Sequence, residues 1–208
     1  LQDVFDESEI SAWITRIEKL AGKKLDEFFV DTKMDGLACS IVYTDGVFEQ
    51  AITRGDGKVG EDVSLNVRTI KNVPLSLRKS EKYHKLLVGR TEIRGEIVMY
   101  KQDFIILNSK RREAGEPEFM NPRNLSAGTI RQLDPKLVSE RPLHFVAYDM
   151  LRENQDDVPS YEFAYQAMRD LGISANNHAK VLIDIKNLMD YINFWQIERE
   201  DLAFNTDG

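Results

Sequence analysis

Two runs of strand-forming residues on either side of a turn signal constrain the fold more than any other stretch of the chain. The first run is Leu37–Tyr43, the second is Val47–Thr53, and Thr44-Asp45-Gly46 lies between them. A short connection containing Asp-Gly between two such runs is typical of a β-hairpin. The sequence therefore predicts a pair of antiparallel strands early in the chain.

Helix and strand patterns follow one another along the rest of the chain. Asp6 and Ser8 are candidate N-caps for a helix whose apolar residues recur at helical spacing until Gly22 ends it. Similar patterns predict strands over 86–100 and 143–151, and helices over 102–112, 160–171 and 188–195. We expect an α+β fold in which twisted, largely antiparallel sheets meet at a cleft and are flanked by helices.

The composition indicates a soluble globular protein with one substantial core or two smaller lobes. Of the 208 residues, 42% are hydrophobic, and no apolar run approaches the roughly 20 residues that span a bilayer. The N-terminus lacks the pattern of a signal peptide, so we expect a cytoplasmic protein without membrane attachment. The single cysteine, Cys39, excludes an internal disulfide, and its place in an apolar run predicts a small buried side chain. The histidines have no Cys or His neighbour at ligand spacing, so we expect no structural metal site.

The net charge of −7 argues against a general polyanion-binding surface, because non-specific nucleic-acid affinity comes mostly from cations that meet phosphates. Any contact with nucleic acid would be local. The best local basic patch covers residues 110–136 and contains Arg123 and Arg131. A helix that starts near Asn124 would place the second arginine about two turns in. A phosphate clamp and a salt-bridged surface helix both fit this pattern.

Lys33 lies just before the hairpin, in the stretch Lys33-Met34-Asp35-Gly36, after the apolar residues Phe28–Val30. We expect the flanking strands to hold this lysine near a packed interior, where burial disfavours the charged form and leaves a nucleophilic amine. We expect a strand that carries Asp31 and Lys33 on one face, with Asp35 following on that face if the strand persists. Such a Lys-x-Asp-Gly string arises by chance in roughly one chain of this length in twenty, so its meaning depends on what accompanies it.

Two later positions add candidate ligand-binding groups. Arg54 begins a turn in which Gly55 and Gly57 permit tight geometry, and its guanidinium could hold two phosphate oxygens; an ordinary turn with a surface arginine is the alternative. Glu96 follows Gly95 within a strand pattern, where a glycine often marks close approach of backbone or ligand. Its carboxylate could accept hydrogen bonds from a ribose hydroxyl or hold a hydrated cation.

Taken together and in order, five stretches resemble the adenylation domain of bacterial NAD-dependent DNA ligases. They are Asp31-x-Lys33-x-Asp35-Gly36, Thr53-Arg54-Gly55-Asp56-Gly57, Arg94-Gly95-Glu96, Asn121 to Asp134, and Asp207-Gly208. The first is shared with ATP-dependent ligases and RNA capping enzymes, and the fourth points to the NAD-dependent branch. The resemblance implies a nucleotidyltransferase fold of ATP-grasp-like type, with one adenylation domain over residues 1–208 whose division into two subdomains is left open.

The resemblance also implies roles for individual residues. Lys33 would attack the α-phosphate of NAD, release nicotinamide mononucleotide and carry AMP, which then passes to the 5′-phosphate of nicked DNA. Asp31 stands where the family generally has Glu, so its hydrogen bond to the adenine amine would be stretched or water-mediated. The implied contacts to the AMP moiety come from Leu1, Asp31, Thr32, Asp35, Arg54 and Glu96, those to DNA from Arg123, Arg131 and Arg199, and those to Mg²⁺, through water, from Glu96 and Asp207.

The partners implied by the resemblance are nicked double-stranded DNA and the remaining domains of a longer ligase, with the protein acting as a monomer. We expect the chain to be a fragment, truncated at both ends, that reacts slowly or not at all with NAD and cannot ligate alone. Two alternatives stay open. One is an ATP-dependent polynucleotide ligase or capping-type nucleotidyltransferase, and the other is a catalytically silent nucleic-acid-binding domain.

Overall fold

The chain is described from a computed structural model that covers residue 4 and residues 6–208. Its internal contacts divide it into two compact units, the first formed by residues 1–32 and 178–201 and the second by residues 33–177 and 202–208. The helices and strands follow in the order α1 Glu7–Ala21, β1 Phe28–Val30, β2 Leu37–Thr44, β3 Val47–Thr53, α2 Ser64–Val67, η1 His84–Leu87, β4 Arg90–Met99, α3 Lys101–Glu113, α4 Pro122–Ile130, α5 Pro135–Ser139, β5 Leu143–Arg152, η2 Gln155–Asp157, α6 Tyr161–Asp170, β6 Lys180–Leu182, α7 Ile185–Glu198 and η3 Arg199–Asp201.

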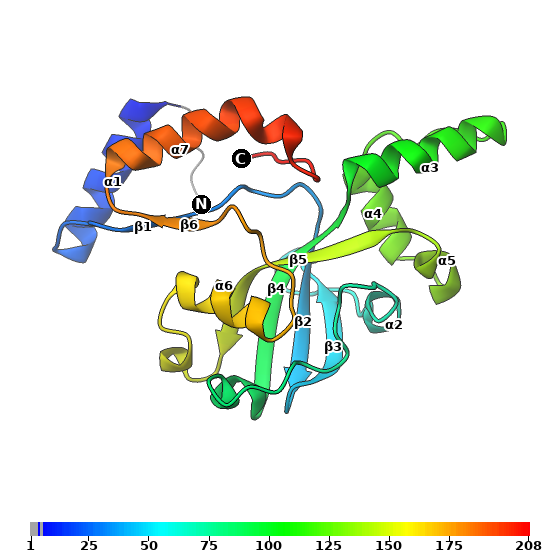
Figure 1. Cartoon of the computed structure of the whole chain (residues 1–208), viewed down its shortest axis with the longest axis horizontal. Helices are drawn as coiled ribbons and strands as arrows, with labels where there is room; N and C mark the ends of the chain where they lie inside the picture. Colours follow the sequence, from blue (N-terminus) through cyan, green and yellow to red (C-terminus); the bar gives the residue numbers. More distant parts are fainter. Residues whose placement is uncertain (1–3, 5) are drawn as a thin grey trace. The chain divides into compact units, whose positions relative to one another are not determined.

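The first unit packs α1 and α7 around the short antiparallel pair β1–β6 (Figure 1). The predicted start and stop of α1 are confirmed: the Asp6 carboxylate accepts a 2.9 Å hydrogen bond from the Glu9 amide, and Gly22 ends the helix in the left-handed region at φ 67°. These elements enclose a small hydrophobic core, and the apolar face predicted for 188–195 points into it. The buried residues of this core are Ile10, Ile14, Phe28, Leu182, Leu188 and Tyr191.

The strand predicted to carry Asp31 and Lys33 is shorter than expected. β1 ends at Val30, because its partner β6 offers only the three residues Lys180–Leu182 for pairing. Neither Asp31 nor Lys33 belongs to a strand, so the prediction that alternation along one strand aligns Asp31, Lys33 and Asp35 is wrong.

The second unit is built on a four-stranded sheet with the order β3-β2-β4-β5, in which all neighbours are antiparallel. The predicted hairpin is confirmed as β2–β3. Asp45 and Gly46 form its turn with φ values of 52° and 73°, and both Asp and Gly tolerate this left-handed backbone. Cys39 on β2 is 2% exposed, as predicted, and burial raises the pKa of its thiol to about 12.

The strand predicted over 86–100 begins later than expected. Residues His84–Leu87 form a 3-10 helix, and β4 starts at Arg90 after a turn at Gly89 with φ 69°. Gly95 is a site of close approach, since a Cβ there would lie 2.5 Å from the Phe145 ring on β5. The neighbouring strand, and not a ligand, therefore requires this glycine.

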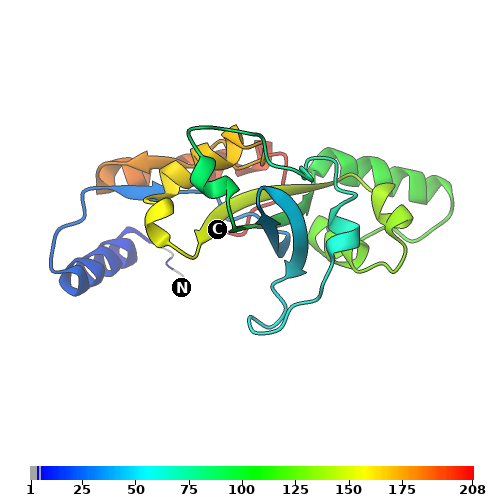
Figure 2. The same ribbon diagram turned by 90° about the horizontal axis from the view of Figure 1, so that it is seen from below.

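Helices cover one side and one end of the sheet. Figure 1 shows α6 lying against the sheet, where it contacts β5, while α3, α4 and α5 gather at one end of the strands. Figure 2 shows the same grouping from below, with the loop after β3 extending away from the sheet. In the described part of the chain, no helix is long and apolar enough to cross a membrane.

Candidate active site

The segment that carries Lys33 is held in place by the C-terminal residues of the same unit. The Lys33 amide donates to the Gly208 carbonyl at 2.7 Å, and the Asp207 amide donates to the Lys33 carbonyl at 3.0 Å. The Asp35 amide donates to the Asn205 carbonyl at 2.8 Å, and Met34 forms an antiparallel bridge with Thr206. This short ladder brings Asp207 beside Lys33, although 174 residues separate them in sequence.

The Lys33 side chain is ion-paired and open to solvent. Its Nζ lies 2.5 Å from Asp207 Oδ1, and the side chain is 65% exposed. The prediction that flanking strands bury this amine is therefore wrong, because β1 ends three residues earlier and Lys33 lies outside the sheet. An exposed amine with one carboxylate in contact can be reached by an incoming electrophile.

Arg123 extends this cluster from the first turn of α4. Asn121 caps the helix by accepting a 2.8 Å hydrogen bond from the Asn124 amide, and Pro122 fits the first helical position because its missing N–H needs no partner there. Arg123 Nη1 lies 2.8 Å from Asp35 Oδ1 and 3.9 Å from Asp207 Oδ2. Two cations and two carboxylates therefore form one connected group.

Glu96 on β4 is the most perturbed acid of this region. Burial raises the pKa of Glu96 to about 7, while the charges of Arg123 and Lys33 act in the opposite direction. Its Oε2 atom is buried without a hydrogen-bond partner among the described residues. A buried oxygen of this kind is costly unless a partner binds, so Glu96 is a candidate ligand contact. The charged groups that act on it are Lys33, Asp35, Arg123 and Asp207.

A hollow of about 480 Å³ opens on the sheet beside the ends of β2 and β3. Arg54 lines it and is held there by a 3.0 Å hydrogen bond from its amide to the Ala38 carbonyl. Gly55 after it has φ 55°, and a side chain there would collide with the Val59 carbonyl, so the tight turn predicted for this segment is confirmed. Other polar walls of the hollow are Ser40, Glu92, Arg94, Tyr148 and Asp149.

Tyr148 is a functional candidate that the sequence interpretation missed. It lies on β5 opposite the register shift of β4, and its pKa is raised chiefly by burial and also by the negative charge of Glu96. The available signal was a single tyrosine in a strand otherwise predicted to be buried and apolar. A half-buried phenol with a hollow on one side offers both a flat apolar face and a hydrogen-bonding group.

Arg131, at the other end of α4, contacts a different partner. Its Nε lies 2.6 Å from Glu61 Oε2, and both residues line a separate hollow of about 450 Å³. The two arginines are thus about two turns apart on α4, as predicted, but they pair with acids of different segments.

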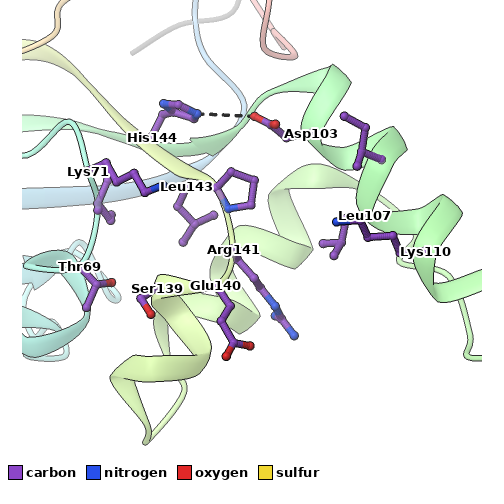
Figure 3. A pocket seen from close by; sticks show the side chains of 13 residues that line it. Thr69, Lys71, Asp103, Leu107, Lys110, Ser139, Glu140, Arg141, Leu143 and His144 are labelled. Atoms are coloured by element: carbon purple, nitrogen blue, oxygen red, sulfur yellow. Dashed lines mark ion pairs between the residues drawn. The ribbon is translucent and has the colours of Figure 1, made fainter. Parts of the chain in front are cut away.

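A third hollow, of about 490 Å³, lies between α3 and the segment that leads into β5 (Figure 3). It contains none of the residues predicted for the site. His144 Nε2 and Asp103 Oδ2 face each other there at 3.6 Å, and the His144 ring stacks on Tyr100 with 3.9 Å between ring centroids. This histidine therefore has a packing role in the structure.

A protein-only metal site is absent from the part of the chain that the structure describes, since no three His, Cys, Asp or Glu side chains are grouped to hold an ion. Glu96 and Asp207, predicted to hold Mg²⁺ through water, are two carboxylates, and Asp207 is already paired with Lys33. Mg²⁺ usually binds one or two carboxylates and completes its shell with water and substrate phosphates. The two residues fit that kind of site only together with a phosphate ligand.

Comparison with known proteins identifies the family. The sequence model of the NAD-dependent DNA ligase adenylation domain matches residues 1–208. The chain belongs to this family. The resemblance seen in the motifs is therefore confirmed over the whole chain.

Individual relatives of this adenylation domain are DNA ligases. The chain is 40% identical over 209 residues to the DNA ligase of Thermomicrobium roseum, covering 100% of the chain and 30% of the relative. Identity is 38% to the DNA ligase of Halothermothrix orenii and 36% to that of Herpetosiphon aurantiacus, with 100% of the chain and 30% and 31% of the relatives covered. The chain therefore spans slightly less than a third of the length of these curated relatives.

Among the described residues predicted to contact nucleotide or DNA, Asp31, Thr32 and Arg199 belong to the first unit of the adenylation domain. The Asp31 carboxylate accepts a 2.7 Å hydrogen bond from the Thr32 amide and contributes to raising the pKa of Tyr191. Arg199 follows α7 and lies 3.9 Å from Glu200. Leu1 lies outside the described residues. Their predicted roles stay predictions.

Proposed function

We propose that this adenylation domain acts within a DNA ligase, accepting AMP from NAD on Lys33 and passing it to the 5′-phosphate of nicked DNA. One observation carries the proposal: an exposed Lys33 amine contacts Asp207 inside a cluster with Arg123, Asp35 and the perturbed Glu96. Lys33 and Asp35 come from one motif, and Glu96, Arg123 and Asp207 come from three others widely separated in sequence. Their convergence around one nucleophile supports covalent nucleotidyl transfer.

In the first step, the Lys33 nitrogen forms a bond to the α-phosphorus of NAD, and the bond from that phosphorus to the nicotinamide mononucleotide phosphate breaks. The amine loses a proton in this exchange. Asp207 is in contact with the amine at 2.5 Å and is the group placed to accept it. The 5′-phosphate of DNA then displaces the lysine, and the 3′-hydroxyl finally displaces AMP to join the strand.

Arg123 neutralises charge on the reacting phosphate. Its guanidinium lies 2.8 Å from Asp35, which fixes one side of the planar fork and leaves other N–H groups for phosphate oxygens. Phosphoryl transfer depends mainly on positioning and charge stabilisation, so such an arginine contributes strongly. By this proposal Asp35 orients Arg123.

The nucleoside of AMP is proposed to lie against the sheet. Arg54 and Tyr148 line the hollow there, and the unpartnered Oε2 of Glu96 could accept a ribose hydroxyl. Tyr148 offers a flat face for the adenine ring. For Leu1, Asp31 and Thr32, a role in binding the AMP moiety is proposed on the family resemblance alone.

The donor set fits Mg²⁺ when phosphate oxygens are present. Glu96 and Asp207 would hold the ion through water, and the ion would supply charge neutralisation for the phosphates of NAD. The ATP-grasp-like fold is part of the same proposal, and it is supported by the antiparallel sheets and the family match.

The remaining proposals concern the whole protein. We propose a monomeric cytoplasmic ligase in which Arg123, Arg131 and Arg199 contact DNA phosphates around the nick, and in which further domains complete the DNA and cofactor sites. Support comes from the longer DNA ligases to which the chain is similar.

The test is covalent attachment of AMP, measured by mass spectrometry after incubation with NAD and Mg²⁺, for the chain alone and for the full-length ligase proposed above. We expect one AMP on wild-type full-length protein, located by peptide mapping on Lys33, and none on Lys33→Ala. Attachment from ATP in place of NAD would favour an ATP-dependent enzyme. Nick binding without any adduct would favour a silent DNA-binding domain and overturn the proposal.

A further inference from the structure

Helix α4 is tied to the rest of the second unit at both ends by buried asparagine side chains that lie outside it. α4 has only nine residues, and a helix this short depends on tertiary contacts for its position. It carries Arg123 in its first turn and is followed directly by Arg131. What holds its ends therefore determines where both guanidinium groups lie.

Asn108 on α3 holds the entry to α4. Its amide nitrogen donates to the Phe119 carbonyl at 3.0 Å, and its amide oxygen accepts from the Phe119 amide at 2.9 Å. The side chain is 8% exposed, so both bonds are shielded from water. Such a paired contact imitates one rung of an antiparallel ladder and fixes the backbone two residues before the N-cap Asn121.

The ring of Phe119 is fixed by two arginines as well. Arg111 lies 4.4 Å and Arg141 5.3 Å from its centroid. Arg111 also donates to the Pro117 carbonyl at 2.7 Å, and Arg141 donates to Thr129 Oγ1 at 2.6 Å. The loop from α3 to α4 is thus constrained by several side chains. Among Asn108, Arg111 and Arg141, Asn108 is the buried side chain.

Asn66 on α2 holds the exit of α4. Its amide nitrogen donates to the carbonyls of Ile130 at 2.7 Å and Gln132 at 2.8 Å, on either side of Arg131. The side chain is 7% exposed. The Ile130 carbonyl belongs to the last residue of the helix, where backbone acceptors lack intrahelical partners, and the Gln132 carbonyl lies two residues beyond it.

We propose that Asn108 and Asn66 are positioning residues for nucleotidyl transfer, with Asn108 placing Arg123 and Asn66 placing Arg131. The proposal rests on the function proposed above, in which Arg123 acts in AMP attachment as well as on DNA, and Arg131 acts on DNA alone. Displacement of Arg123 by about 1 Å would lengthen its 2.8 Å contact with Asp35 beyond hydrogen-bonding distance.

A matched control exists in the same unit. Asn72 makes the same paired contact with a backbone, donating to the Phe145 carbonyl at 2.8 Å and accepting from the Phe145 amide at 3.0 Å. Phe145 belongs to β5 and not to α4. Asn72→Ala therefore removes equivalent hydrogen bonds without releasing the helix.

The first experiment measures the rate of AMP attachment from NAD in the full-length ligase. We expect Asn108→Ala to lower the rate about tenfold and Asn66→Ala and Asn72→Ala to lower it less than threefold. Asn66→Ala should instead slow transfer of AMP to nicked DNA about tenfold. In a double-mutant cycle, Asn108→Ala should add little to Arg123→Ala, because both remove the same interaction.

The second experiment measures amide hydrogen exchange of the chain by mass spectrometry, which needs no activity. We expect faster exchange over residues 117–125 in Asn108→Ala and over 128–133 in Asn66→Ala, with neither segment altered in Asn72→Ala. Asn108→Asp provides a second variant in case the alanine variant folds poorly: it keeps the volume but places an acceptor oxygen opposite the Phe119 carbonyl, so it should also speed exchange over residues 117–125.

The proposal is overturned if Asn108→Ala and Asn72→Ala lower the rate equally, if the effects of Asn108→Ala and Arg123→Ala multiply, or if exchange over 117–125 is unchanged. A different result marks failure of the proposed function: wild-type protein that forms no AMP adduct, or Arg123→Ala that reacts at the wild-type rate, while exchange still changes over 117–125.

Discussion

The two ends of α4 present arginines in different surroundings. Arg123 pairs with Asp35 at 2.8 Å and lies 3.9 Å from Asp207, which also pairs with Lys33, whereas in the described part of the chain Arg131 pairs with the exposed Glu61 at 2.6 Å. The same residue type on one short helix therefore belongs to a connected charge cluster at one end and to an isolated surface pair at the other. We therefore expect Arg123 to contribute more to nucleotidyl transfer than Arg131, because Arg123 belongs to the charge cluster around Lys33. Residue type and ion-pair length do not distinguish the two arginines.

The strongest way to break this comparison is to replace the acid at each end. Asp207→Asn removes the charge in contact with Lys33 and near Arg123, so we expect AMP attachment to fall about 100-fold, in line with losses of positioned acid–base groups. Glu61→Gln should change the rate less than threefold. The rates are measured by quenched time courses and mass spectrometry, and equal effects of the two variants would contradict the distinction.

Replacing the arginines should give the next largest difference. We expect Arg123→Ala to slow AMP attachment by about 10- to 100-fold, because the reacting phosphate loses a fixed cation. Arg131→Ala should leave this step within threefold of wild type and weaken binding of nicked DNA, with a shallower dependence of affinity on salt. A slower AMP attachment in Arg131→Ala than in Arg123→Ala would reverse the assignment.

The pH dependence of the unfolding free energy should also distinguish the two arginines, because Arg123 and not Arg131 acts on the ionisation of Glu96. Its pKa is raised from the ordinary 4.5 to about 7, so the folded chain keeps the proton to higher pH than the unfolded chain. The unfolding free energy contributed by this group therefore falls as the pH rises from 4.5 through about 7, and then levels off. After allowance for solvent screening, the loss is roughly 1 to 2 kcal/mol.

Urea unfolding across this pH range tests the expectation. Glu96→Gln should remove the loss, and Arg123→Ala should enlarge it, because the cation that favours ionised Glu96 is gone. Arg131→Ala, which is not among the charges that act on Glu96, should behave like wild type. A pH profile that Glu96→Gln leaves unchanged would show that another group titrates.

The smallest effect is expected for the ion pair at the Arg131 end. Arg131 and Glu61 are 49% and 60% exposed, and exposed pairs of this kind contribute about 0 to 1 kcal/mol. Arg131→Ala should thus change the unfolding free energy by less than about 1 kcal/mol, and added salt should diminish the difference. A loss above about 2 kcal/mol would mean that Arg131 also supports the helix end held by Asn66.

Much of the fold was predictable because local signals agreed with tertiary contacts. The Asp45-Gly46 turn, the Asp6 and Gly22 ends of α1, and the Ser160 cap of α6 need only a few neighbouring residues to form. The strand ends were less predictable. β1 stops at Val30 because β6 is short, and no property of residues 31–33 reports the length of a partner 150 residues away.

The sequence proposed a set of site residues but not their geometry. Motif order pointed to Lys33, Arg54, Glu96, Arg123 and Asp207, whose roles stay predictions, while the family match confirms the family itself. The expected burial of Lys33 was wrong, since its environment depends on a ladder with residues 205–208 that the local sequence does not encode. Tyr148 was missed because a tyrosine within a strand gives no sign of the hollow it lines.

By itself, the sequence of this chain determined its family, its hairpin and its helix ends, and it predicted Lys33 as the nucleophile, because these depend on residue types at short or fixed spacing. The tertiary structure alone decided that Asp207 contacts Lys33, that Arg123 joins them while Arg131 does not, and that two buried asparagines hold the helix between. Most of these contacts join distant segments: the Lys33–Asp207, Arg123–Asp35 and Asn66–Ile130 pairs are separated by 174, 88 and 64 residues. Such contacts depend on how the whole sheet and its covering helices pack, which no local pattern specifies.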